Sequence, residues 1–144
     1  MRVKIKRIDA SLPLPAYQTS GAVAFDLYSR EDMAIAPKTI ALIPTNIIVE
    51  IPKGYMLMLA SRSSTPKKKG LMVPNGIGII DQDYHGTKDE IMLQVYNFSD
   101  KETAVSRGER VGQAAFVRVD RSEWEEVAEM PETSRGGFGS TGLI

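Results

Sequence analysis

The densest run of polar side chains in the sequence lies between Asn75 and Gly86. Asn75 and the glycines of this run permit tight turns, while Ile79-Ile80 is an apolar step that folding would bury. The carboxylate of Asp81 would then be held at a fixed edge, with Tyr84 close to it. A rigidly held carboxylate can act as a general base or hold a metal-bound water. From composition alone, however, a plain β-hairpin with solvated carboxylates is the more frequent interpretation of such a run.

A second polar run, residues 61–65, contains Arg62 among several hydroxyl side chains. An arginine together with hydroxyls and backbone N–H groups can bind phosphate oxygens. The lysine triplet at 67–69 follows, and such triplets are most often solvated loops. The glycine-rich C-terminal end lacks the GxxxxGKS/T pattern of a P-loop. The sequence therefore indicates an anion site near Arg62 but does not support a P-loop nucleotide site.

Short apolar runs must form the scaffold that positions these side chains, and their lengths and spacing predict β-strands. The runs are 3–8, 47–51, 55–59, 91–96 and 114–119. Pro52-Lys53-Gly54 predicts a β-turn with proline at its second position and glycine at its fourth. Residues 122–130 fit two helical turns or an extended segment equally well. The predicted fold is all-β, a compact sandwich or distorted barrel with little helix.

The length of 144 residues fits one domain, and 18 basic against 18 acidic side chains give a formal net charge of zero. This balance gives no electrostatic footprint for nucleic acid or an anionic membrane, so neither is expected as a partner. The absence of cysteine excludes disulfides, zinc–thiolate sites and cysteine nucleophiles, and a single histidine, His85, excludes a multi-histidine metal site. There is no signal-peptide pattern and no run of ~20 apolar residues, so we expect a soluble, cytoplasmic protein.

Composition divides the chain into a β domain at residues 1–130 and a C-terminal arm at residues 131–144. Four of the eight residues from Arg135 to Gly142 are glycine. Glycine adds little to a core, and terminal segments of this kind are usually mobile. We therefore expect the arm to be flexible.

Five short motifs, taken in order, resemble the signature of the trimeric deoxyuridine triphosphate nucleotidohydrolases, or dUTPases. The resemblance runs from about residue 3 to residue 142 and implies a dUTPase-like fold of the β-clip type. No single motif is decisive, but five in fixed order are hard to obtain by chance. The motifs are 24–28, 62–64, 75–86, 108–113 and 135–142.

The resemblance implies that Asp81 orients and deprotonates the water that attacks the α-phosphorus of dUTP, releasing dUMP and pyrophosphate. Mg²⁺ would neutralise the phosphates, held mainly by them and by waters rather than by protein ligands. The family also implies a homotrimer with shared active sites. In the cell the reaction would limit uracil incorporation into DNA and supply dUMP for thymidylate synthesis.

The resemblance also assigns substrate contacts residue by residue. The uracil edge would be read by Asn75 and by backbone groups near Ile79, Ile80 and Met92, and Tyr84 would pack beneath the deoxyribose and exclude a 2′-hydroxyl. The phosphates would be held by Arg62, Ser63, Ser64 and Gln113. Phe138 would stack on the uracil while the γ-phosphate is covered by Arg135, Ser140 and Thr141. Asp26 would act structurally or through water.

Two departures and two alternative functions accompany the resemblance. Thr87-Lys88-Asp89-Glu90 makes the third motif longer than the common form, and only two residues separate Arg135 from Phe138 where four are usual. The related dCTP deaminases share an Arg-Ser-Ser stretch, but Gln94 stands where their catalytic glutamate is expected, and an amide cannot shuttle protons as a carboxylate does. A β-sandwich binding module without turnover is the other alternative.

Overall fold

The computed structural model describes residues 1–137, of which 36% are in strands and 4% in helix. The prediction of an all-β fold with little helix is therefore confirmed. The described elements are β1 (Lys4–Arg7), β2 (Phe25–Tyr28), β3 (Met33–Ile35), β4 (Ile40–Pro44), β5 (Ile47–Glu50), β6 (Tyr55–Ala60), α1 (Thr65–Lys69), β7 (Leu71–Met72), β8 (Gly78–Ile80), β9 (Met92–Asn97), β10 (Thr103–Val105) and β11 (Arg110–Arg118).

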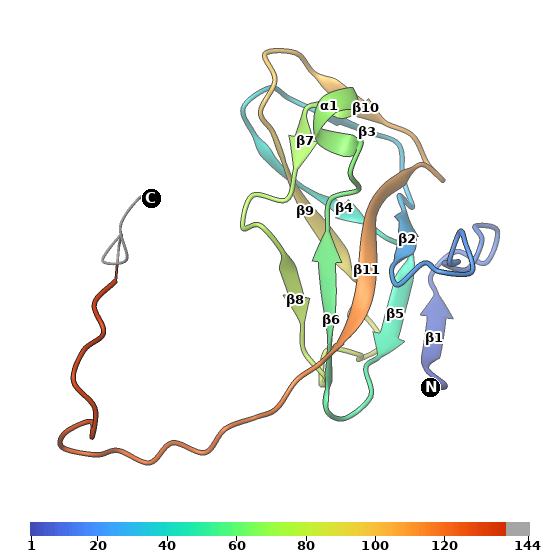
Figure 1. The fold of residues 1–144 in the computed structure, drawn as a ribbon. Helices are drawn as coiled ribbons and strands as arrows, with labels where there is room; N and C mark the ends of the chain where they lie inside the picture. The colour runs from blue at the N-terminus through green and yellow to red at the C-terminus, as the bar shows by residue number, and fades with distance from the viewer. Residues whose placement is uncertain (138–144) are drawn as a thin grey trace.

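The strands form antiparallel sheets that pack around one core (Figure 1). The largest has the order β2-β11-β6-β8 and the next β4-β9-β7, while β1-β5 and β3-β10 are two-stranded. On β6, Leu57 and Leu59 are buried and their neighbours are half-buried, as the two-residue period of a strand requires. Buried side chains from both larger sheets share the core, among them Leu27, Ile43, Leu57, Leu93 and Val111.

The turn before β6 differs from the expected one by one position. The Pro52 carbonyl accepts a hydrogen bond from the Tyr55 N–H at 3.1 Å, so proline is the first residue of the turn and Gly54 the third. Gly54 has φ of 80°, a left-handed conformation that glycine adopts without a steric penalty. The turn joins strands of two different sheets, since β5 pairs with β1 and β6 with β11 and β8.

The lysine triplet is not the solvated loop that the sequence favoured. Residues 65–69 form α1, with Pro66 in the first turn, where a missing N–H costs nothing, and Gly70 ending the helix at φ of 65°. Lys69 is held on both sides. Its Nζ lies 2.8 Å from Glu109 Oε1 and donates to the Ala104 carbonyl at 2.9 Å.

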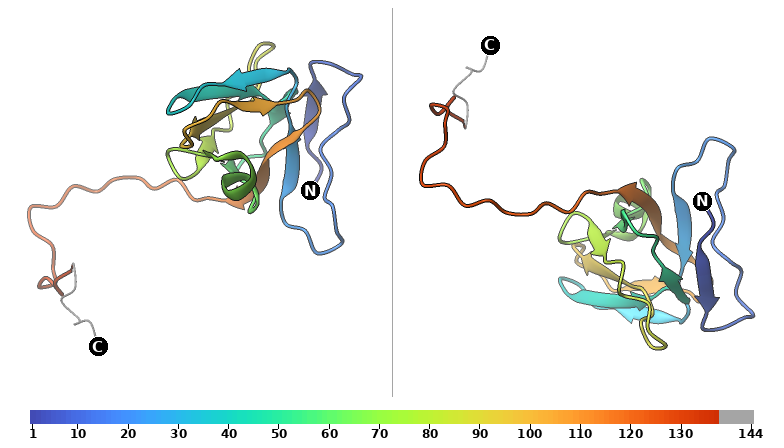
Figure 2. Two further views of the ribbon diagram at one scale, coloured as in Figure 1. Left: turned by 90° about the horizontal axis from the view of Figure 1, so that it is seen from above. Right: turned by 90° about the horizontal axis from the view of Figure 1, so that it is seen from below.

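After β11 the chain leaves the sheets as an exposed segment without helix or strand through residue 137 (Figure 2). This segment includes residues 122–130, whose sequence fits two helical turns or an extended segment equally well. The structure shows that they are not helical. Within residues 1–137 no helix has the length and apolar character needed to cross a bilayer.

Candidate active site

One part of the candidate site is a pair of arginines around a buried carboxylate. Asp26, on β2, is 6% exposed. Its Oδ1 accepts from Arg62 Nε at 2.8 Å, and its Oδ2 accepts from Arg110 Nη1 at 3.1 Å. The pairing of β11 with β2 shifts register between Arg110 and Gly112, the kind of irregularity that re-aims a side chain. Two guanidinium groups against one carboxylate leave a net positive charge, which suits phosphate oxygens.

The segment beside Arg62 is bonded to β11 of the same sheet. Gln113, on β11, donates from Nε2 to the Ser61 carbonyl at 3.0 Å. Ser63 is exposed and Ser64 is half-buried, and both lie between Arg62 and the start of α1. The residues expected to bind phosphate therefore lie together at the end of β6.

A second part of the site surrounds Asp81, the first residue after β8. Gln82 donates from Nε2 to the Tyr55 carbonyl at 3.0 Å, which ties the segment to the start of β6. Asp81 is exposed and faces a pocket of about 520 Å³. The pocket is lined by Tyr55, Met56, Asp81, Gln82, Asp83, His85, Val119 and Arg121. The Asp81 carboxylate is thus open to solvent while its backbone follows directly from a paired strand.

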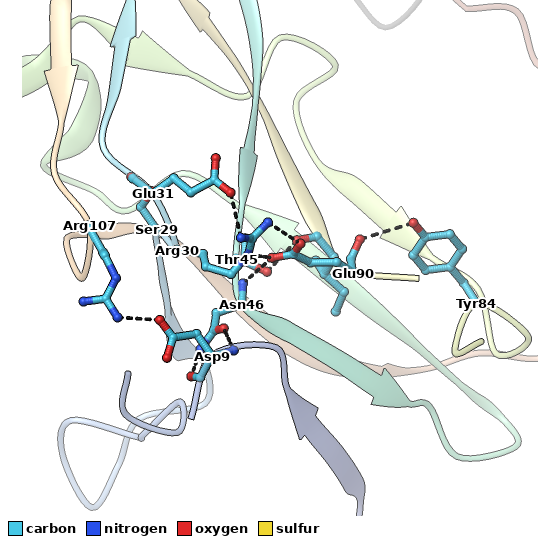
Figure 3. A network of polar contacts seen from close by, with 10 residues as sticks. Asp9, Ser29, Arg30, Glu31, Thr45, Asn46, Tyr84, Glu90 and Arg107 are labelled. Atoms are coloured by element: carbon cyan, nitrogen blue, oxygen red, sulfur yellow. Dashed lines mark hydrogen bonds and ion pairs between the residues drawn. The ribbon is translucent and has the colours of Figure 1, made fainter. Parts of the chain in front are cut away.

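The loop between β8 and β9 is closed by hydrogen bonds around Glu90 (Figure 3). The Tyr84 hydroxyl donates to the Glu90 carbonyl at 3.2 Å. The Glu90 carboxylate accepts from Arg30 Nε at 2.9 Å and from the Asn46 N–H at 2.8 Å. The bond to Glu90 is the main cause that raises the pKa of Arg30 above its ordinary value, so this guanidinium stays charged.

Arg62 and Asp81 lie at opposite ends of β6. Ile80 is paired with Leu57, which places Asp81 beside Met56, six residues before Arg62. At ~3.3 Å per residue this is a separation of roughly 20 Å along the strand. Arg62 also turns toward Asp26 on β2, on the side of the sheet away from β8. One chain therefore does not bring the expected base and the expected phosphate ligands together.

The residues expected to read uracil are divided between two sheets. Ile79 is 58% exposed and Ile80 is half-buried on β8, while Met92 is half-buried on β9 of the other sheet. Asn75 is exposed in the turn before β8, toward the Arg62 end of β6.

Of the residues expected to close the site, Arg135 lies exposed on the segment that leaves the sheets. Phe138, Ser140 and Thr141 fall outside the described residues.

Sequence reasoning missed three residues that the structure places in or beside the site. Arg110 lies inside the motif at residues 108–113. Its positive charge next to a turn could have marked it as a residue of the site. Arg30 and Glu90 are 60 positions apart, and no spacing or composition pairs them.

Among residues 1–137 there is no group of three or more histidine, aspartate or glutamate side chains arranged to hold a metal ion. Asp81 and Asp83 both face the pocket and offer the hard oxygen atoms that Mg²⁺ accepts, either directly or through its waters.

The chain is similar to known proteins over nearly its whole length. A family model described as dUTPase matches residues 10–142. The deoxyuridine 5′-triphosphate nucleotidohydrolase of Dictyoglomus turgidum is 43% identical over 149 residues, covering 99% of each chain, and that of Hydrogenobaculum is 40% identical with the same coverage.

Solved structures give the same family. The dUTPase of Streptococcus mutans is 31% identical and superposes with a TM-score of 0.76, covering 83% of this chain and 98% of its own. The dUTPase of Staphylococcus bacteriophage 80alpha, solved with dUpNHpp, reaches a TM-score of 0.87 with 99% of each chain covered. At 24% identity that second likeness concerns the fold alone.

The all-β fold and these relatives place the chain in the class of nucleotide hydrolases. Because the family model and the relatives span nearly the whole chain, the chain belongs to the dUTPase family.

Proposed function

We propose that this member of the family hydrolyses dUTP to dUMP and pyrophosphate by magnesium-assisted attack of water on the α-phosphorus. The observation that carries the proposal is the placement of Asp81, an exposed carboxylate at the end of a paired strand facing a pocket. Its oxygen would accept the proton of the attacking water, which must approach in line with the leaving pyrophosphate. Magnesium, when bound to the triphosphate, supplies charge neutralisation, and Asp81 and Asp83 would face its water shell.

Substrate selection would rest on the segment around Asp81. Asn75 and the backbone near Ile79, Ile80 and Met92 would pair with the uracil edge. Tyr84 would lie beneath the deoxyribose and leave no room for a 2′-hydroxyl. Sites that satisfy buried hydrogen bonds discriminate strongly, because a wrong substrate leaves their polar groups unpaired.

The triphosphate would be held at the other polar cluster. Arg62, Ser63, Ser64 and Gln113 lie together at the end of β6, with Asp26 holding Arg62 in place. The positive charge of this cluster would bind the phosphates, and Asp26 would keep Arg62 aimed without touching substrate itself.

The separation of the two clusters supports a site shared between chains. Since Asp81 lies roughly 20 Å from Arg62 along β6, a second copy must bring its Arg62 cluster to the Asp81 pocket. We propose a homotrimer, 47.7 kDa for three chains of 15.9 kDa, in which each site takes Asp81 from one chain and Arg62 from another.

Residues 131–144 would form the flexible arm that closes the site. Phe138 would stack on the uracil while Arg135, Ser140 and Thr141 cover the γ-phosphate. Closing a site excludes water and strengthens the charge interactions within it. In a cytoplasmic protein this turnover would keep uracil out of DNA and supply dUMP for thymidylate synthesis.

Hydrolysis in ¹⁸O-labelled water tests this reaction. With dUTP and Mg²⁺, attack at the α-phosphorus puts the label in dUMP and leaves pyrophosphate unlabelled. Label in pyrophosphate would mean attack at the β-phosphorus. Ammonia released from dCTP would indicate a deaminase, and no product from either nucleotide would indicate a binding module. Each of these outcomes contradicts the proposal.

A further inference from the structure

Glu90 is the most heavily bonded carboxylate near the candidate site. Arg30 contacts it with two nitrogens, Nε to Oε1 at 2.9 Å and Nη2 to Oε2 at 3.0 Å. The Asn46 N–H adds a third bond to Oε1 at 2.8 Å. The Glu90 side chain is 14% exposed and that of Arg30 is 27% exposed, so the pair is largely shielded from solvent. A bidentate, partly buried pair of this kind fixes geometry as well as charge.

The peptide of Glu90 in turn holds Tyr84. The Tyr84 hydroxyl donates to the Glu90 carbonyl at 3.2 Å, and the Tyr84 N–H donates to the Asp81 carbonyl at 3.3 Å. Tyr84, 39% exposed, is thereby anchored at its hydroxyl, as Figure 3 shows, and also through its backbone. The ring therefore depends on the position of Glu90, and Arg30 holds the side chain of that residue.

The fold has other means of holding the start of β9. Ile91 is fully buried, its N–H donates to the Ile47 carbonyl at 2.9 Å, and its own carbonyl accepts from the Thr45 hydroxyl at 2.6 Å. The Ile91 N–H belongs to the same peptide group as the Glu90 carbonyl, so its bond to Ile47 holds that peptide to β5. The ion pair with Arg30 adds a second hold on Glu90, through its side chain, at the end of the loop of residues 81–90.

We propose that Arg30 and Glu90 are positioning residues for Tyr84, and that their ion pair sets how closely the ring approaches the sugar. The inference rests on the proposed function, in which Tyr84 packs beneath the deoxyribose. Glu90 ends the unusually long segment 87–90, so a loop with extra residues gains an anchor on two residues at strand ends, Arg30 after β2 and Asn46 between β4 and β5. Loss of the pair should let the ring retreat and admit a 2′-hydroxyl.

The test compares kcat/KM for dUTP and for UTP in Arg30→Gln, Glu90→Gln, the double variant and Arg30→Lys. The ratio of dUTP to UTP should fall about tenfold in each glutamine variant, the size expected for one charge-assisted contact. The ratio in the double variant should fall no further, because the interaction with the loop that both changes break is the Arg30–Glu90 pair; Arg30→Gln removes in addition the pair with Glu31, which does not reach Tyr84. Arg30→Lys, which keeps the charge, should recover part of the ratio.

Asp100→Asn is the matched control, because it removes an exposed ion pair with Lys38, 3.0 Å long, that does not contact the loop. Its ratio of kcat/KM for dUTP to kcat/KM for UTP should equal that of the wild-type protein. If the pair served only stability, the glutamine variants would melt at lower temperature and keep the wild-type ratio. A folded Glu90→Gln protein whose ratio stays within about twofold of wild type overturns the inference.

Should Glu90→Gln fail to fold, Tyr84→Phe removes only the hydroxyl that Glu90 holds, and its ratio should fall as well. An unchanged ratio there also overturns the inference. Wild-type protein that does not hydrolyse dUTP contradicts the proposed function itself. Wild-type hydrolysis with unchanged ratios in the variants contradicts only the role of Arg30 and Glu90.

Discussion

Asp81 combines solvent access with a backbone fixed by a paired strand, which is what a general base requires. Asp81→Asn keeps the shape and can still accept a hydrogen bond from water, but it cannot take its proton. We expect dUTP binding to persist and kcat to fall by ~10²–10⁴-fold, measured by pyrophosphate release and by titration calorimetry. Asp100→Asn, which removes an exposed carboxylate between β9 and β10, is the control. Turnover of Asp81→Asn within about twofold of wild type would remove Asp81 from the mechanism.

Asp26 holds Arg62 and Arg110 in the cluster proposed to bind phosphate. In Asp26→Asn the two guanidinium groups of Arg62 and Arg110 would face each other with no compensating charge. We expect KM for dUTP to rise and the free energy of unfolding to fall by about 1–3 kcal/mol. Because like-charge repulsion is screened by salt, part of the stability should return in 1 M NaCl. A KM equal to that of wild type would show that Asp26 does not position Arg62.

At the scale of elements, the N-terminal turn after β1 is attached to the rest of the fold through Asp9. Hydrogen bonds from Ser11 and then from Arg107 lower the pKa of Asp9 well below its ordinary value. A carboxylate with a lowered pKa stabilises the fold above the pKa of the unfolded chain, ~3.9, and loses that contribution as the pH falls toward the folded value.

The difference in Tm between wild type and Asp9→Asn should therefore be constant from neutral pH to about pH 5 and shrink below about pH 4. Thermal melts across pH 2 to 7 measure it, with Asp100→Asn as an exposed control. A difference that does not change with pH would mean that the Asp9 contacts do not depend on its charge.

The arm gives a second prediction at this scale. A protein lacking residues 135–144 should keep its fold, since the last strand within residues 1–137 ends at Arg118, and should lose most of its kcat. Phe138→Ala should have a smaller effect on the free energy of substrate binding and turnover, about the 1–3 kcal/mol of one aromatic–base stack. Circular dichroism and steady-state kinetics measure the two effects. Near-normal turnover of the truncated protein would mean that the arm does not close the site.

The elements could be predicted from sequence where local pattern decides them. The alternation at Leu57 and Leu59 marks β6, and the step at 79–80 places Asp81 after a strand. The helix α1 was predictable as well, because Pro66 near its start and Gly70 at its end are ordinary helix boundaries. Because three consecutive lysines are most often found in solvated loops, the sequence favoured a loop there instead.

What the sequence could not predict depends on long-range pairing. Asp26 meets Arg110 across 84 positions, and Arg30 meets Glu90 across 60. The first pair meets because β2 pairs with β11. The second meets because Arg30, two residues after β2, bonds to Pro44 at the end of β4, which pairs with Met92 on β9. Local composition does not encode either pairing. The resemblance assigned roles to single residues. The distance between Asp81 and Arg62 could be obtained only from the register in which β8 pairs with β6.

At the scale of the whole molecule, the central claim is that one site takes Asp81 and Arg62 from different chains. Asp81→Asn and Arg62→Ala proteins should each be nearly inactive alone. We would unfold the two, refold them together in equal amounts, verify mixed trimers by native mass spectrometry and measure dUTP turnover. Random assembly gives native Asp81 and native Arg62 to one site in four, so we expect about a quarter of wild-type turnover. Mixed trimers as inactive as the separate variants would contradict the shared site.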